Sequence, residues 1–173
     1  MIIGVGGVSR SGKSSLSRFL KKELHKKTGE IHLDNYIKDS SHWHFFTRYP
    51  VFYLSKIHKV FNMEHPNVID FNRLYEDILQ SSQQNEIVIA EGFLITYDAR
   101  IKNLFDKYIH IALSKSVFIQ RRTRDFKSNL WYTNHVWNCF MKYGTDYSNL
   151  NHIVVNGDNE IDMQSILKFI SDK

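Results

Sequence analysis

The chain has 173 residues, of which 42% are hydrophobic and 24% are charged, and its formal net charge is +5. Such a composition is typical of one globular domain with a sizeable core. Cys139 is the single cysteine, which excludes an internal disulfide and a cysteine-rich zinc site. No apolar run approaches the roughly 20 residues that span a bilayer, and the first residues lack the basic and apolar segments of a signal peptide. We therefore expect a cytoplasmic protein with no membrane partner.

The positive charge has two interpretations. A phosphate-handling protein needs cations near an anionic substrate, and a nucleic-acid binder needs them along its surface. Here the lysines and arginines are spread over many segments rather than gathered in one tail. This distribution favours a small anionic substrate, and we expect no nucleic-acid partner.

The first predicted elements are a buried strand, a glycine-rich loop and a helix. Residues 1–5 form a short apolar run that is typical of a buried strand. Beyond the loop, Leu16, Phe19, Leu20 and Leu24 share one helical face. The segment between strand and helix is a complete Walker A phosphate loop, Gly7-Val8-Ser9-Arg10-Ser11-Gly12-Lys13-Ser14.

This loop predicts nucleotide binding. Its glycines let backbone N–H groups point inward at a phosphate chain, and the start of the helix adds its dipole. Lys13 can reach the β- and γ-phosphates, and the Ser14 hydroxyl can hold Mg²⁺. The alternative, a turn that binds nothing, leaves the required order of strand, loop and helix unexplained. We expect ATP to contact Gly7, Val8, Ser9, Arg10, Ser11, Gly12, Lys13, Ser14 and Ser15.

A second strand is predicted at residues 30–33, and Asp34 follows it directly. Ligands of parallel sheets gather at the carboxyl ends of the strands, so Asp34 is expected beside the phosphate loop. A carboxylate there can accept the proton of an attacking hydroxyl and orient that hydroxyl for in-line transfer. The alternative is a turn residue, since Asp-Asn pairs often stabilise turns.

Residues 40–69 are predicted to be an acceptor-binding insertion. The segment is rich in aromatic residues and histidines and contains both prolines, Pro50 and Pro66. It has two compatible interpretations: a helical excursion whose aromatics pack on the main domain, or a lid or acceptor-binding subdomain, because loops of this length are often functional. His42 and His44 are close in sequence, but no second pair has a zinc-like spacing.

The next predicted pair is a helix at residues 70–81 and a strand at residues 87–90. The strand is a continuous apolar run, as in the centre of a parallel sheet. Glu91 follows it and precedes Gly92. A carboxylate at this place can assist Mg²⁺, directly or through water. We expect the metal site to consist of Ser14 and Glu91, and the alternative is a glutamate that faces solvent.

The remaining chain alternates in the same way. Apolar patterns predict strands at residues 108–113 and 152–155, and helices at residues 115–127, 134–143 and 161–170. Such alternation indicates a parallel sheet with helices on both faces. The fold class we expect is α/β: a single P-loop NTPase domain over residues 1–173 with a five-stranded parallel sheet, plus a lid and an acceptor-binding segment.

Residues 121–132 are the predicted lid. Arg121, Arg122 and Arg124 end the preceding helix, where guanidinium groups could stabilise the charge that develops on a transferred phosphoryl group. We expect Arg121 and Arg124 to take part in catalysis and Arg122 to bind ATP. The alternative is a solvated helix end, where cations are favoured in any case.

Several motifs together resemble the uridine kinase-like P-loop nucleoside kinases. They are the phosphate loop, Asp34-Asn35-Tyr36, Glu91-Gly92-Phe93-Leu94 and the arginines of residues 121–124. Within that group, the stretch His135-Val136-Trp137-Asn138-Cys139-Phe140-Met141-Lys142-Tyr143 resembles nicotinamide riboside kinases. The resemblance implies transfer of the ATP γ-phosphate to the 5′-hydroxyl of nicotinamide riboside, a step of NAD salvage that yields nicotinamide mononucleotide.

The resemblance also implies roles for individual residues. Asp34 would be the base, with Lys13, Arg121 and Arg124 as the catalytic cations. The acceptor site would comprise Asp34, Tyr36, Lys38, Asp70, Arg124 and Trp131. Of these, Asp70 and Arg124 would hold the ribose. Trp131 could offer an aromatic face to the pyridinium cation, or it could simply pack the lid on the domain. Adenine would be covered by Gly157, Asp158 and Asn159.

Other functions stay open at this level. Uridine or cytidine could be the acceptor, and the protein could be a regulatory nucleotide-binding protein instead. A GTPase would carry an Asn-Lys-x-Asp motif to read guanine, and the sequence has none. ATP with Mg²⁺ and a small nucleoside are the expected partners, and the protein could be a monomer or a homodimer.

Overall fold

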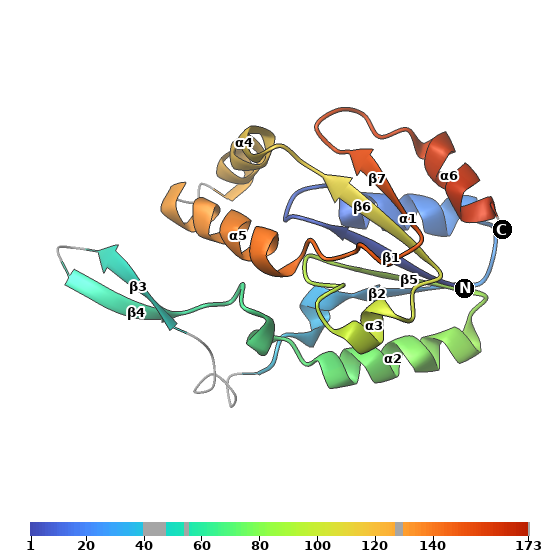
Figure 1. Ribbon diagram of the computed structural model, residues 1–173, viewed down its shortest axis with the longest axis horizontal. Helices are drawn as coiled ribbons and strands as arrows, with labels where there is room; N and C mark the ends of the chain where they lie inside the picture. The colour runs from blue at the N-terminus through green and yellow to red at the C-terminus, as the bar shows by residue number, and fades with distance from the viewer. Residues whose placement is uncertain (40–47, 54–55, 127–129, 173) are drawn as a thin grey trace.

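The computed structural model describes residues 1–39, 48–53, 56–126 and 130–172 (Figure 1). Its centre is a parallel sheet of five strands in the order β2-β5-β1-β6-β7. These strands are β1 (Ile2–Gly7), β2 (Thr28–His32), β5 (Ile87–Gly92), β6 (Lys107–Ala112) and β7 (His152–Asn156). The predicted α/β class and the five-stranded parallel sheet are therefore confirmed.

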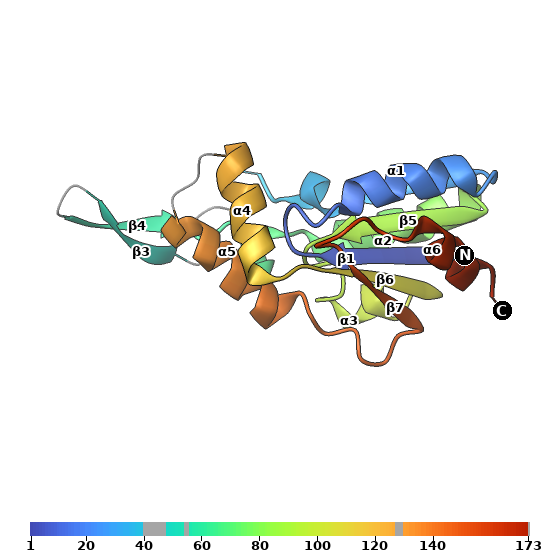
Figure 2. The same ribbon diagram turned by 90° about the horizontal axis from the view of Figure 1, so that it is seen from above.

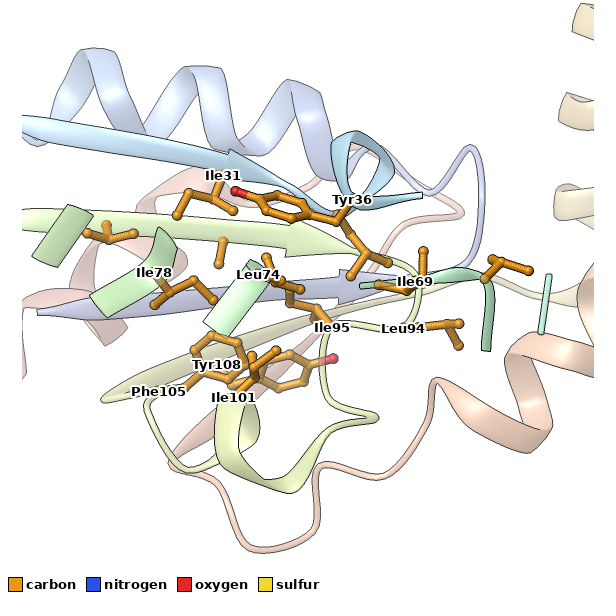
Figure 3. Close-up of a cluster of buried hydrophobic side chains, with 14 residues drawn as sticks. Ile31, Tyr36, Ile69, Leu74, Ile78, Leu94, Ile95, Ile101, Phe105 and Tyr108 are labelled. Atoms are coloured by element: carbon orange, nitrogen blue, oxygen red, sulfur yellow. The ribbon is translucent and has the colours of Figure 1, made fainter. Parts of the chain in front are cut away.

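Helices cover both faces of the sheet (Figures 1 and 2). Helices α1 (Lys13–Glu23) and α6 (Met163–Ser171) pack on one face through Leu16, Leu20, Ile166 and Ile170. Helices α2 (Phe71–Gln84) and α3 (Ala99–Lys102) cover the other face, where their apolar residues join the cluster shown in Figure 3. Because both faces are buried, β5 contains the continuous apolar run at residues 87–90 that the sequence predicted.

A third apolar cluster joins the carboxyl end of the sheet to helices α4 (Lys115–Phe126) and α5 (Leu130–Tyr143). It consists of Val8, Phe118, Val136 and Phe140. Helix α5 begins four positions before the predicted start at residue 134. The predicted lid at residues 121–132 thus contains the end of α4 and the first residues of α5, while residues 127–129 lie outside the described chain.

The predicted insertion contains a two-stranded antiparallel hairpin, β3 (Arg48–Tyr53) and β4 (Lys56–Phe61). The hairpin projects from the body of the domain beside α5 (Figures 1 and 2). A helical excursion is therefore wrong for these residues. Their content of aromatic and β-branched residues suits an extended, pleated backbone better than a helix.

The hairpin is connected to the sheet on both sides through short 3₁₀ helices. The first, η1 (Leu33–Tyr36), follows β2, and the second, η3 (Pro66–Val68), precedes α2. Two backbone hydrogen bonds connect the segments next to these 3₁₀ helices: the N–H of Lys38 donates to the carbonyl of Val68, and the N–H of Asp70 donates to the carbonyl of Tyr36. Among the described residues, no helix is both long and apolar enough to cross a membrane.

Candidate active site

The phosphate loop connects β1 to α1 at the carboxyl end of the sheet (Figure 1). Gly12 precedes the helix with φ of 105°, a conformation in the left-handed region that glycine tolerates best. Arg10 also has a positive φ, 67°, which is uncommon for a residue with a side chain. The loop closes on itself, because the backbone of Ser11 and the ammonium of Lys13 both donate to the carbonyl of Val8, each at 3.1 Å.

A cavity of about 750 Å³ opens over this loop. It collects the carboxyl ends of β2 and β5, the segment after the hairpin and the end of α4, which are far apart in sequence. Its described lining is Ser9, Arg10, Gly12, Lys13, Ser14, Ser15, Arg18, Leu33, Asp34, Ile37, Met63, Glu64, Ile69, Glu91, Gly92, Phe93, Leu94, Arg121, Arg122 and Arg124.

Lys13 is the cation at the base of the cavity. Burial lowers the pKa of its ammonium, and the nearby carboxylates of Glu91 and Asp34 act in the opposite direction. The structure therefore brings together the three residues that the sequence assigned to phosphate binding, proton transfer and metal binding. A lysine ammonium at this place can bind the negatively charged oxygens of a phosphate chain.

Glu91 lies at the end of β5 and is buried. Its Oε1 atom accepts a hydrogen bond from the Ser14 hydroxyl at 2.6 Å and lies 2.8 Å from Nδ1 of His32. The two predicted metal-site residues are thus in direct contact. Both present oxygen atoms, which Mg²⁺ prefers, so the residues fit the ion.

His32 is a neighbour of the predicted metal site that sequence reasoning missed. It is the last residue of β2 and is in register with Glu91 on the adjacent strand. A histidine that contacts a metal-binding carboxylate orients it. The available signal was its place at a strand end, two residues before Asp34.

Asp34 lines the cavity, but it does not follow β2 directly. Leu33 separates it from the strand, and both belong to η1. Leu33 packs on Gly92, where an added Cβ would overlap the Leu33 side chain. The close approach of η1 to β5 therefore needs glycine at position 92 and sets where Asp34 stands.

Two of the three lid arginines contact the phosphate loop. Arg121 donates to the carbonyl of Arg10 at 3.3 Å and to that of Gly157 at 2.7 Å. Arg122 is buried and donates to the Ser9 hydroxyl at 3.0 Å. Arg124 is exposed and also lines the cavity. All three arginines thus face the predicted nucleotide and acceptor space.

The predicted adenine-covering residues follow β7. Gly157 contacts Arg121 as described, and the Asp158 carboxylate accepts the backbone N–H of Ser114 at 2.8 Å. Asn159 is exposed. The cavity lining formed by described residues does not include these three, and their contact with the base stays a prediction.

Four residues predicted for the acceptor site stand outside the described cavity lining. Tyr36 is a core residue whose hydroxyl donates to Asp77 at 2.8 Å (Figure 3). Lys38 donates to the carbonyl of Asn67 at 2.9 Å. Asp70 caps helix α2 by accepting the N–H of Arg73.

Trp131 is the fourth of these residues. It is 45% exposed on the first turn of α5, and its ring lies parallel to that of His135 at 5.8 Å between centroids. The acceptor role of all four residues stays a prediction, and the contacts found for Tyr36 and Asp70 already explain their presence structurally.

Glu64 is a carboxylate of the cavity that sequence reasoning missed. It lines the cavity, accepts a hydrogen bond from the Tyr132 hydroxyl at 2.7 Å and is half-buried. Burial raises the pKa of Glu64 and the charge of Asp34 raises it further, while Tyr132 and Arg122 lower it. Asp34 and Glu64 both line this cavity. Glu64 lies in a loop without a recognisable sequence motif, so only its charge could have indicated a functional role.

Comparison with known proteins supports a kinase. The uridine kinases of Cronobacter sakazakii (strain ATCC BAA-894) and Klebsiella pneumoniae (strain 342) are 25% and 26% identical to this chain. Each alignment covers 72% of this chain and 67% of the relative. No protein-family model matches the chain.

Solved structures share the fold at lower identity. Shikimate kinase from Bacteroides thetaiotaomicron superposes with a TM-score of 0.58 at 16% identity, over 99% of each chain. A gluconokinase from Sinorhizobium meliloti 1021 superposes with a TM-score of 0.56 at 13% identity, over 96% of this chain and 87% of the other. The chain therefore shares its fold with these two proteins.

Proposed function

We propose that this P-loop kinase transfers the γ-phosphate of ATP to the 5′-hydroxyl of a ribonucleoside. One observation carries the proposal: Asp34, Lys13, Glu91 and three arginines converge on a single cavity above the phosphate loop. Phosphoryl transfer needs this set, namely a base for the acceptor hydroxyl and cations for the phosphate charge. Similarity to uridine kinases supports a nucleoside as the acceptor.

Two acceptors are the leading candidates. Uridine is favoured by the named relatives. Nicotinamide riboside is favoured by the resemblance of residues 135–143 to nicotinamide riboside kinases. Both carry a ribose whose 5′-hydroxyl can be phosphorylated, so the same mechanism applies to either.

The phosphate side holds the nucleotide. Backbone N–H groups of residues 7–15 and the Lys13 ammonium bind the phosphate chain. Ser14 and Glu91 would hold Mg²⁺, which neutralises phosphate charge when bound. Arg121 and Arg122 already contact the loop at Arg10 and Ser9. Their guanidinium groups can therefore reach bound phosphates without a large movement.

The acceptor side holds the nucleoside. Asp34 orients the 5′-hydroxyl and accepts its proton as the oxygen attacks phosphorus. Glu64, the second carboxylate of the cavity, can accept hydrogen bonds from ribose hydroxyls. Apolar side chains of Met63, Ile37 and Phe93 line the same space and exclude water from the reaction.

The deciding experiment measures ADP release from ATP and Mg²⁺ with uridine, cytidine, nicotinamide riboside, adenosine, pantothenate or no acceptor. Turnover with one nucleoside well above the acceptor-free rate supports the proposal and identifies the substrate. ATP binding without turnover by any acceptor would contradict it and favour a regulatory nucleotide-binding protein. A Lys13→Ala variant controls for a contaminating kinase, because it should lose the activity.

A further inference from the structure

Tyr132 connects the two sides of the cavity. It lies in the first turn of α5, and its hydroxyl donates to Oε1 of Glu64 at 2.7 Å. Its ring supports the Arg122 guanidinium, whose carbon lies 5.3 Å from the ring centroid. Arg122 in turn donates to the Ser9 hydroxyl of the phosphate loop at 3.0 Å. One side chain thus contacts the acceptor carboxylate and a cation of the phosphate side.

A second contact anchors the same helix to the same segment. His135 lies one turn after Tyr132, and its Nε2 atom is 2.9 Å from Oδ1 of Asn62. That oxygen also accepts the backbone N–H of Glu64 at 3.2 Å. Helix α5 therefore holds residues 62–64 at two points, through the backbone and through the carboxylate. The position of Glu64 therefore depends on α5 as well as on its own loop.

We propose that Tyr132 is a positioning residue of the acceptor site. Its hydroxyl orients the Glu64 carboxylate toward the acceptor, and its ring holds Arg122 against the phosphate loop, so the two substrates are positioned together. The inference rests on the proposed function, since it takes the cavity to hold an acceptor beside a nucleotide. It assigns a role to a residue of the predicted lid that is neither base nor phosphate ligand.

The charged groups around Glu64 explain why the Tyr132 hydroxyl should affect the pKa of this carboxyl. Asp34 from η1 repels the Glu64 carboxylate and burial disfavours its charge, whereas Arg122 from α4 and Tyr132 from α5 stabilise it. His135, also from α5, has a pKa lowered by burial and adds no positive charge near neutral pH. Removing the Tyr132 hydroxyl should therefore raise the pKa of Glu64. A protonated Glu64 accepts fewer hydrogen bonds from an acceptor.

Tyr132→Phe tests the hydroxyl alone, because the ring remains under Arg122. With the nucleoside found active in the panel, we expect the acceptor KM to rise about tenfold, with the ATP KM within twofold of wild type. The acidic limb of kcat/KM for the acceptor should move to higher pH. Tyr132→Leu removes the ring as well, and should raise the ATP KM in addition.

Tyr75→Phe is the matched control. Tyr75 lies on α2 and also supports an arginine, with the Arg100 guanidinium carbon 5.4 Å from its ring centroid. It is outside the described cavity lining, so its substitution should leave both KM values and the pH profile unchanged. A role of Tyr132 in folding alone would give the control and the variant similar profiles.

The Glu64→Ala background shows whether Tyr132 acts through Glu64. If it does, adding Tyr132→Phe to Glu64→Ala should not raise the acceptor KM further. Equal effects of Tyr132→Phe in both backgrounds would overturn the proposal, and so would identical kinetics of Tyr132→Phe and Tyr132→Leu.

A titration separates this inference from the proposed function. Carboxyl ¹³C NMR of the substrate-free protein, with Glu64→Gln to assign the signal, reports the pKa of Glu64 without turnover. A higher pKa in Tyr132→Phe supports the positioning role, and an unchanged pKa overturns it. Absence of turnover with every acceptor would instead reject the kinase proposal, and the Glu64 titration would then decide the role of Tyr132 by itself.

Discussion

The phosphate side and the acceptor side of the cavity are built in different ways. The centre of the phosphate side, residues 7–15, comes from one strand, loop and helix that follow each other in the chain, and its loop is closed by bonds to a backbone carbonyl. The acceptor side comes from η1, the segment after the hairpin and α5. It is held by bonds between side chains, such as Tyr132 with Glu64 and His135 with Asn62.

The difference matches the different requirements of the two substrates of a kinase, the phosphate donor and the acceptor. A phosphate chain is the same in every reaction, so a geometry made by the backbone serves it without special side chains. An acceptor differs from one enzyme to the next, and side-chain contacts between distant segments can change without disturbing the sheet. Except at Tyr132, which contacts both sides, perturbing one side should therefore leave the other largely intact, and the following experiments test that separation.

The largest expected effect is on phosphoryl transfer, while nucleotide binding should stay nearly unchanged. Asp34→Asn should lower kcat by about 10²- to 10⁴-fold, because the acceptor hydroxyl loses its base. Nucleotide affinity, measured by calorimetry with ATP and Mg²⁺, should change little, since the phosphate loop is untouched. Asn35→Ala, an exposed neighbour on η1, is the control for local disturbance. A large loss of ATP affinity in Asp34→Asn would show that the two sides are not separable.

The part of the sheet beneath the phosphate loop should make the folding stability sensitive to acid. Burial lowers the pKa of His110 to about 4, with His152 and Lys13 acting in the same direction. His110 is in register with Gly6, just before the phosphate loop, and stacks on Tyr147 with 4.4 Å between centroids.

The sign follows from proton binding. An unfolded histidine has a pKa of about 6.5, so between that pH and about 4 the unfolded chain binds more protons than the folded one. Stability should be full above pH 6.5 and fall by up to about 3 kcal/mol as the pH drops toward 4. Urea denaturation across this range should show a shallower loss for His110→Phe. An unchanged slope would mean that His110 is not the group responsible.

Gly92 is the point where β5 of the phosphate side contacts η1 of the acceptor side. Gly92→Ala would push its Cβ into Leu33, and Leu33 precedes Asp34. We expect a loss of about 1–3 kcal/mol of stability from overpacking, with a lower kcat because Asp34 moves. Thermal unfolding and steady-state kinetics measure the two effects. A stable variant with normal kcat would show that η1 adjusts without moving the base.

The smallest expected effect concerns the orientation of Glu91. His32→Gln should weaken Mn²⁺ binding in the presence of ATP by about tenfold, because an oriented carboxylate loses one partner. Electron paramagnetic resonance of free Mn²⁺ measures this without turnover. His25→Asn, at an exposed histidine with positive φ, should bind Mn²⁺ like wild type. Unchanged affinity in His32→Gln would leave His32 as a packing residue.

Much of the phosphate side was predictable from sequence, and so was the place of Asp34 at the same edge of the sheet. The apolar strand, the glycine spacing and the helical stripe are local patterns, and the strand-end rule placed Asp34 and Glu91 at the correct edge of the sheet. Errors in this region were small. Asp34 belongs to a short 3₁₀ helix rather than following the strand directly, because Leu33 has to pack against Gly92.

The acceptor side was predicted less well. The hairpin was open to a helical interpretation because aromatic residues occur in both kinds of element. Tyr36 and Asp70 stand outside the described cavity lining, where they bond to Asp77 and Arg73, and their acceptor roles stay predictions. Glu64, in contrast, stands in no repeated pattern, and only its contacts reveal it.

The sequence by itself determined the sheet, the phosphate loop and the chemical class of the residues at the strand ends. These depend on periodicity and on spacing within a few residues, which the order of amino acids records directly. Only the tertiary structure decided that Tyr132 meets Glu64 and that His32 meets Glu91. Such pairs join residues far apart in sequence, and their partners are chosen by how helices and strands pack rather than by any local pattern.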